Sequence, residues 1–294
     1  IDRDLLVIPG VAIHMDRSVN KGAELNPAVD LLPLLGCGKE PGAFRKLIAE
    51  AAGVREEHLL STELFLYPRT KAVQTGLNGE FIVSPRLDDL QCVFGCLEGF
   101  LAAKPGGSLP VLAVFNNEEV GSNTRQGADS TFLTDVLERI AHGCGLDSDA
   151  WKAAIANSFM VSADNAHAIH PAHPEYADKG EFPVLGGGIV IKYNANQRYT
   201  TDAVSGAVFQ AICQEAGVPV QRYSNRADLP GGSTLGNIST AHLSVPTVDI
   251  GLPQLAMHSV CETAGAADTD YLVKAMTAYF SRDFHRDRDG GIVF

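Results

Sequence analysis

The chain has 294 residues, of which 45% are hydrophobic and 20% charged, as in an ordinary globular protein with room for a sizeable core. A formal net charge of −12 without any basic run argues against nucleic-acid binding, because phosphate binding needs clustered Lys and Arg. No apolar run approaches the roughly 20 residues that cross a bilayer. We therefore expect no membrane partner. The six cysteines include no Cys-x-x-Cys pair, so we expect free thiols in a cytoplasmic protein.

The first part of the chain predicts few regular elements. Residues 5–15 resemble a strand broken by Pro9-Gly10, residues 16–40 a loop, residues 41–52 a helix and residues 61–67 a strand. The chain starts at Ile1 with neither an initiator methionine nor a signal peptide. We therefore expect it to begin inside a longer protein.

Strands alternate with helices from about residue 79 onward. Strands are predicted at 109–117, 158–163, 219–223 and 245–250, and helices at 90–103, 129–143, 202–216 and 267–280. This alternation predicts an α/β domain in which helices flank a mixed, mostly parallel sheet.

The predicted strand at 109–117 runs directly into two adjacent carboxylates. Its apolar residues fit a strand buried on both faces, and such sheets place their chemistry outside the carboxyl ends of the strands. Successive side chains point opposite ways, so Glu118 and Glu119 cannot share one partner. One of them can bind a metal while the other moves a proton. An Asn-Asn-Glu-Glu run on its own could also be a solvated loop.

Acidic or imidazole side chains recur just past other predicted strands as well. They are Asp88 and Asp89, Glu118 and Glu119, Asp164, and His258. Carboxylate oxygen with some imidazole nitrogen suits a hydrolytic zinc, cobalt or manganese site, and one bridging carboxylate would give two ions about 3.5–4 Å apart. Such a pair lowers the pKa of a bridging water, and an unligated glutamate can take its proton.

Seven short motifs follow one another along the chain. They are RLDDL (86–90), NEEVGS (117–122), SADNAH (162–167), VIK (190–192), QRY (197–199), GGSTLG (231–236) and AMHS (256–259). In this order they resemble the aspartyl aminopeptidase family of dinuclear zinc peptidases. The resemblance spans nearly the whole chain from Leu6 onward.

The resemblance implies a role for each residue of the expected metal site. Asp88 would be the bridging carboxylate and Glu118 the general base. Glu119 and Asp164 would be terminal ligands on opposite ions, with His258 as the imidazole ligand. Asp89 stands where the family usually has asparagine, so we do not count it as a ligand.

The resemblance also implies substrate contacts. In such enzymes the histidine of a stretch like 11–15 (VAIHM) reaches a neighbouring subunit's active site and helps to stabilise the oxyanion, which gives His14 a role in trans. The alternative is an edge-strand histidine on a dimer surface. Lys192, with His167 close by, would bind an acidic N-terminal residue, and Arg198 and Arg226 are lesser candidates. Each of these cations could instead form a structural ion pair.

The resemblance implies an aminopeptidase that removes N-terminal Asp or Glu from peptides, with two divalent ions, zinc or else cobalt or manganese. It would self-associate into dimers and a tetrahedral dodecamer. Residues 1–75 would be the C-terminal part of an inserted β-rich dimerisation domain, and residues 76–294 the catalytic domain. Two alternatives are a non-catalytic assembly subunit and a dinuclear-metal amidase acting on acylated amino acids.

One family motif has no counterpart in this chain. The family's other metal-binding histidine lies in a His-Thr-Asp-Ser-Pro stretch, which is not found here. We therefore expect an N-terminal portion that carries this ligand to be missing. The consequence would be that one of the two ions binds poorly.

Overall fold

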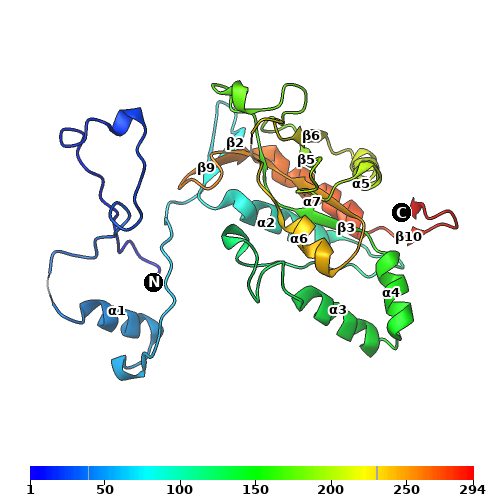
Figure 1. Ribbon diagram of the computed structural model, residues 1–294, viewed down its shortest axis with the longest axis horizontal. Helices are drawn as coiled ribbons and strands as arrows, with labels where there is room; N and C mark the ends of the chain where they lie inside the picture. The colour runs from blue at the N-terminus through cyan, green and yellow to red at the C-terminus, as the bar shows by residue number, and fades with distance from the viewer. Residues whose placement is uncertain (39, 230) are drawn as a thin grey trace. The chain divides into compact units, whose positions relative to one another are not determined.

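The computed structural model describes every residue except Lys39 and Pro230 (Figure 1). The chain divides into two compact units, Ile1–Arg69 and Thr70–Phe294. The second unit contains all the residues expected to bind metal or to act as the base.

The unit Ile1–Arg69 has little regular structure. Its described residues form one α-helix, α1 (Ala43–Ala52), and two short 3₁₀ helices, Val19–Lys21 and Glu56–His58. Val7 and Leu34 form an isolated antiparallel bridge. The predicted helix at 41–52 is confirmed, but the strands expected at 5–15 and 61–67 are wrong, and the described part of this unit contains no strand. A strand needs a hydrogen-bonded neighbour along its length, which a single bridge does not supply.

A four-stranded mixed sheet lies at the centre of the unit Thr70–Phe294. Parallel pairing joins the first two and the last two strands of the sheet, and antiparallel pairing joins the middle two. The sheet confirms the predicted α/β class. In spatial order its strands are β3 (Met160–Ala163), β7 (Thr247–Gly251), β5 (Ile189–Tyr193) and β6 (Val220–Ser224).

The two faces of this sheet differ in chemistry. Helices α2 (Leu87–Ala102), α5 (Ala203–Glu215) and α7 (Ala266–Phe280) contact the sheet, and α2 and α7 lie side by side (Figure 1). Val248 and Ile250 belong to the apolar core that these helices share with the sheet. Because side chains alternate along a strand, Asp249 points to the opposite face, where a Cβ on Gly236 of α6 (Leu235–His242) would lie 2.3 Å from its carboxylate.

The chain runs directly from the first sheet into a second, five-stranded sheet at two places. Its strands, in spatial order, are β1 (Val73–Thr75), β2 (Phe81–Ser84), β9 (Glu262–Gly265), β8 (Pro253–Leu255) and β4 (Ala166–His167). The chain passes from β3 to β4 at Asp164-Asn165 and from β7 to β8 at Leu252. Asp88 follows β2, and His258 lies between β8 and β9. The junctions of this second sheet therefore carry three of the expected metal ligands.

The predicted helices correspond to α2, α3, α5 and α7, with small differences at their ends. Asp202 and Ser205 form a capping box at the start of α5, which fixes that boundary. The sequence did not predict α4, α6 or the very short strands. The remaining α-helices and strands are α3 (Phe132–Gly143), α4 (Ser148–Ala156), β10 (His285–Arg286) and β11 (Ile292–Val293).

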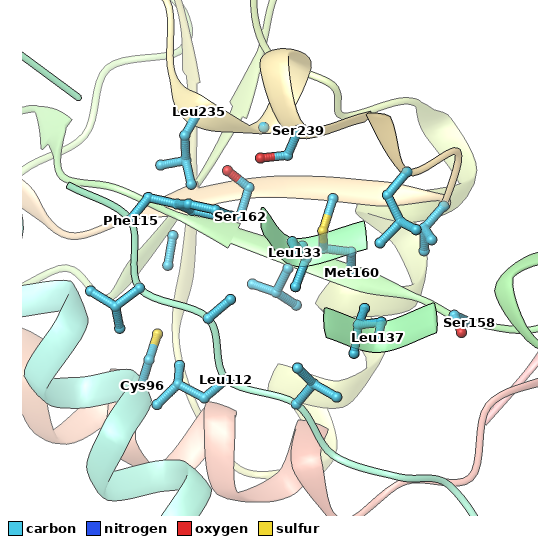
Figure 2. Close-up of a pocket in the computed structure, with 18 of the residues that line it drawn as sticks. Cys96, Leu112, Phe115, Leu133, Leu137, Ser158, Met160, Ser162, Leu235 and Ser239 are labelled. Atoms are coloured by element: carbon cyan, nitrogen blue, oxygen red, sulfur yellow. The ribbon is translucent and has the colours of Figure 1, made fainter. Parts of the chain in front are cut away.

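The strand predicted at 109–117 is wrong, because the structure assigns no strand between α2 and the short 3₁₀ helix η3 (Glu118–Val120). The segment instead lines a cavity of about 970 Å³. Figure 2 shows Leu112 and Phe115 in its wall, together with Leu133 and Leu137 of α3 and Met160 of β3. Within this segment Leu112 and Phe115 are half-buried, whereas Leu109, Val111 and Val114 are exposed, and no strand forms. No helix in the described part of the chain is long and apolar enough to cross a membrane.

Candidate metal centre

Asp88, Glu119 and His258 come together at one point. The Nε2 atom of His258 lies 3.1 Å from Oδ2 of Asp88 and 3.2 Å from Oε2 of Glu119. One ligand atom from each of the three residues lies within 4.8 Å of the others. The Asp88 side chain is only 6% exposed, whereas those of His258 and Glu119 are 61% and 57% exposed. Asp88 is therefore the buried member of the group, and the side formed by His258 and Glu119 is open to solvent.

Asp88 also belongs to a second group, with Asp89 and Asp164. Oδ2 of Asp164 accepts a hydrogen bond from the Thr234 hydroxyl at 3.0 Å. Oδ1 of Asp89 accepts the backbone N–H of Asn165 at 3.0 Å, so part of this carboxylate is used in holding the chain after β3. The structure thus brings together all four expected metal ligands, with Asp88 common to both groups.

The crowded carboxylates perturb one another. Burial, together with the nearby Asp164 and Glu119, raises the pKa of Asp88 to about 8. Burial and Asp164 raise the pKa of Asp89 well above its usual value. A divalent cation would offset this repulsion, and carboxylate oxygens with one imidazole nitrogen are donors that zinc accepts. The residues present therefore fit a zinc site.

Glu118 lies beside the two groups but belongs to neither among the described residues. It opens η3, which is framed by two left-handed residues, Asn117 (φ +61°) and Gly121 (φ +99°). Burial, with Asp164 and Glu119 nearby, raises the pKa of Glu118 above its ordinary value. A half-buried glutamate of this kind is a better proton acceptor at neutral pH than an exposed one.

Lys192 is 3% exposed, and its Nζ lies 3.4 Å from Oδ2 of Asp164. Burial opposes its charge, but Asp164 and other nearby groups outweigh burial and raise the pKa of Lys192. The ring of Tyr199 lies beneath the ammonium, 5.5 Å from Nζ to the ring centre. Burial, then the charges of Lys192 and His258, lower the pKa of the neighbouring His167. Lys192 is thus paired with a candidate ligand.

Left-handed backbone conformations cluster at this centre. Arg86 (φ +60°), Asn117 (φ +61°), Ala256 (φ +58°) and His258 (φ +67°) are all within two residues of, or are themselves, candidate functional residues. Such conformations in residues other than glycine cost about 1–3 kcal/mol each, and they persist only where the surrounding structure enforces them. Their clustering is typical of a functional site.

Several supporting residues have no signal in the sequence. Glu262 accepts the backbone N–H groups of both Asp88 and His258. The amide nitrogen of Asn165 donates to Oε1 of Gln91 at 3.0 Å. Gly251 has to lack a side chain, because a Cβ there would lie 2.0 Å from the backbone oxygen of Asp164. In the sequence Glu262 is only an acid four residues after His258, which does not distinguish it from other acids.

His14 lies in the unit Ile1–Arg69, where it is exposed. The metal-centre residues all belong to the other unit. The role of His14 in a neighbouring subunit stays a prediction.

Comparison with known proteins identifies the family. The model of the aminopeptidase I zinc metalloprotease family (M18) matches residues 1–280. This chain belongs to the M18 family. A probable M18 family aminopeptidase 2 from Clostridium acetobutylicum is 45% identical over 285 residues, which cover 96% of this chain and 66% of that protein. The chain thus spans about two thirds of the length of this M18 relative.

Solved structures support the M18 fold. A structure described as the complex of Ape4 and Nbr1 is 34% identical, with a TM-score of 0.82, and covers 95% of this chain and 58% of its own. A structure described as the S. cerevesiae mApe1 dodecamer is 27% identical, with a TM-score of 0.73, and covers 87% of this chain and 61% of its own.

Proposed function

We propose that this protein is an aminopeptidase that removes N-terminal residues, Asp or Glu in particular, from peptides. The observation that carries the proposal is the convergence of Asp88, Glu119 and His258 beside the unligated Glu118. Membership of the zinc metalloprotease family M18 supports the same conclusion.

In this proposal two zinc ions share Asp88. Glu119 and His258 lie together on one side of Asp88, and Asp164 lies in its other group, so these residues divide between two ions. Zinc at this position would act as a Lewis acid and lower the pKa of a water molecule. The second group offers only carboxylates among the described residues, so we expect it to bind zinc more weakly than the group that contains His258.

Glu118 acts as the general base. It is half-buried and close enough to Asp164 and Glu119 for their charges to raise its pKa. In this role it takes a proton from the attacking water and returns it to the amine that leaves. Because it holds no ligand position, its removal should affect turnover far more than zinc content.

The preference for an acidic residue rests on Lys192 and His167. The ammonium of Lys192 is fixed by Asp164 and the Tyr199 ring, and His167 lies close by. A substrate carboxylate would gain a charged partner there, whereas a neutral side chain would not. We expect Lys192→Met to reduce the preference for Asp over Leu substrates.

The proposal includes self-association. One M18 relative is described as a dodecamer. For this protein we infer a dodecamer as well, with dimers arranged tetrahedrally. In such an assembly His14 of one subunit would stabilise the oxyanion in the site of its neighbour.

The test compares Glu118→Gln with Glu98→Gln, a change of an exposed glutamate on α2. Both zinc-loaded variants are assayed for release of Asp from an Asp-peptide and from N-acetyl-Asp. We expect Glu118→Gln to lose about 10²–10⁴-fold in peptide turnover at unchanged zinc content, and Glu98→Gln to match the unaltered protein. Unchanged peptide turnover in Glu118→Gln would contradict the proposal, and preferential release from N-acetyl-Asp would favour an amidase.

A further inference from the structure

We propose that Glu262 is a positioning residue that holds Asp88 and His258 at the spacing zinc requires, and so sets the zinc affinity of this site. The Glu262 side chain is 2% exposed and opens strand β9. Its Oε2 accepts the backbone N–H of Asp88 at 3.0 Å, and its Oε1 accepts the backbone N–H of His258 at 2.8 Å. One carboxylate therefore joins two segments that lie far apart in the sequence.

The two hydrogen bonds hold the backbones of Asp88 and His258, whose side chains face each other. Oδ2 of Asp88 lies 3.1 Å from Nε2 of His258, and both backbones are held by the same Glu262 side chain. His258 has φ +67°, a conformation that costs about 1–3 kcal/mol and persists only where the surroundings enforce it. The bond from its N–H to Glu262 is such an enforcement. Without it, His258 would relax and its ring would leave the position opposite Asp88.

The charge of Glu262 acts in the same direction. Glu262 forms no ion pair with any cationic side chain among the described residues, although it is buried. A buried carboxylate without a cation is costly, and two backbone N–H groups offset only part of that cost. A divalent ion between Asp88 and His258 would provide the missing positive charge. Glu262 thus favours the bound ion without taking a ligand position.

Asp268 provides a matched control on helix α7. Its side chain is fully buried, and its two oxygens accept the backbone N–H groups of Gly186 and Gly188 at 2.8 and 2.9 Å. Those glycines precede β5, whereas Lys192, near the metal centre, lies toward the end of the same strand. Asp268→Asn therefore makes the same chemical change as Glu262→Gln, at the other end of β5.

The experiment measures zinc affinity by competition with a chromophoric chelator, and the Co²⁺ absorption spectrum, in the unaltered protein and both variants. We expect Glu262→Gln to weaken zinc binding about 10–100-fold and to change the Co²⁺ spectrum, whereas Asp268→Asn stays within about twofold. Unfolding of the zinc-free variants shows whether both lose similar stability. An unchanged zinc affinity in Glu262→Gln, or an equal loss in both variants, overturns the inference.

Two further measurements cover a variant that does not fold. Glu262→Asp keeps the charge but is one methylene too short to reach both N–H groups, so weaker zinc binding is expected, and unchanged affinity would count against Glu262. In the unaltered protein, the amides of Asp88 and His258 should be protected from hydrogen exchange, and rapid exchange of both would overturn the inference. The inference rests on the proposed metal centre. If the unaltered protein binds no zinc, that proposal fails, whereas zinc binding that is insensitive to Glu262 defeats this inference alone.

Discussion

The candidate metal centre has two halves that are built differently. Asp88 and Asp164 form a buried half, in which Asp164 follows strand β3 and is held by Thr234 and Lys192. Glu119 and His258 form an exposed half. Glu119 follows a segment without strand structure, and His258 lies in a loop with two left-handed residues. Asp164 of the buried half is held by core side chains, whereas both residues of the exposed half lie outside the strands.

Two segments of the unit Thr70–Phe294 show that apolar composition alone does not produce a strand. Strand β7 has two large apolar residues, Val248 and Ile250, whereas the segment 109–117 has more of them. β7 has hydrogen-bonded neighbours on both sides, β3 and β5, and all five of its residues are buried. The segment 109–117 has no such neighbour in the described chain and borders a cavity. The strand that is buried on both faces is thus the one that has a hydrogen-bonded strand on each edge.

Hydrogen exchange should show the largest contrast between the two regions. We expect amides of β7 at 248–250 to exchange on the order of a thousandfold or more slowly than those at 111–115, because the first open only with the core. Exchange measured by mass spectrometry on the intact chain tests this. Equal protection would show that 109–117 pairs as a strand in solution.

A matched pair of substitutions compares the two halves in stability. Asp164→Asn leaves Lys192 buried without its charge partner, which should cost about 3 kcal/mol or more of the zinc-free protein's free energy of unfolding. Glu119→Gln alters an exposed side chain and should cost less than about 0.5 kcal/mol. Urea unfolding of both variants measures the difference. Similar costs would mean that the halves are equally integrated in the core.

The pH dependence of the zinc-free protein gives a smaller effect. The pKa of Asp88 is about 8 in the folded chain and near 3.8 without the fold, so the folded state binds the extra proton between these values. Stability should therefore fall as pH rises from 6 to 8, by about 2 kcal/mol. Asp88→Asn should flatten this dependence. Stability that rises with pH over this range would contradict the burial of Asp88 among carboxylates.

The sequence predicted the long periodic elements and the residues at their ends. Helices α5 and α7 and strand β7 follow from apolar spacing and turn residues, and Asp88, Asp164 and His258 from the polar residues just beyond such elements. The second sheet could not be predicted in this way. Its strands are two to four residues long, too short to show an alternation of apolar and polar residues. In addition, β2 pairs with β9, which lies far from it in the sequence.

The supporting groups of the centre were hidden for a similar reason. Glu262 acts through the backbone of Asp88, and Asn165 through Asp89, and both partnerships join segments that are distant in sequence. No residue spacing encodes such contacts. Lys192 and Asp164 likewise meet because β3 and β5 belong to one sheet, although they are distant in sequence.

The most direct test of the metal centre is a crystal structure of the zinc-loaded protein with anomalous data collected at the zinc edge. We predict a strong zinc peak bounded by Asp88, Glu119 and His258, and a weaker one toward Asp164. Glu118 should lie nearby without binding either ion. Zinc bound elsewhere, for example at His170 and His173, with Asp88 and His258 free of metal, would contradict the account.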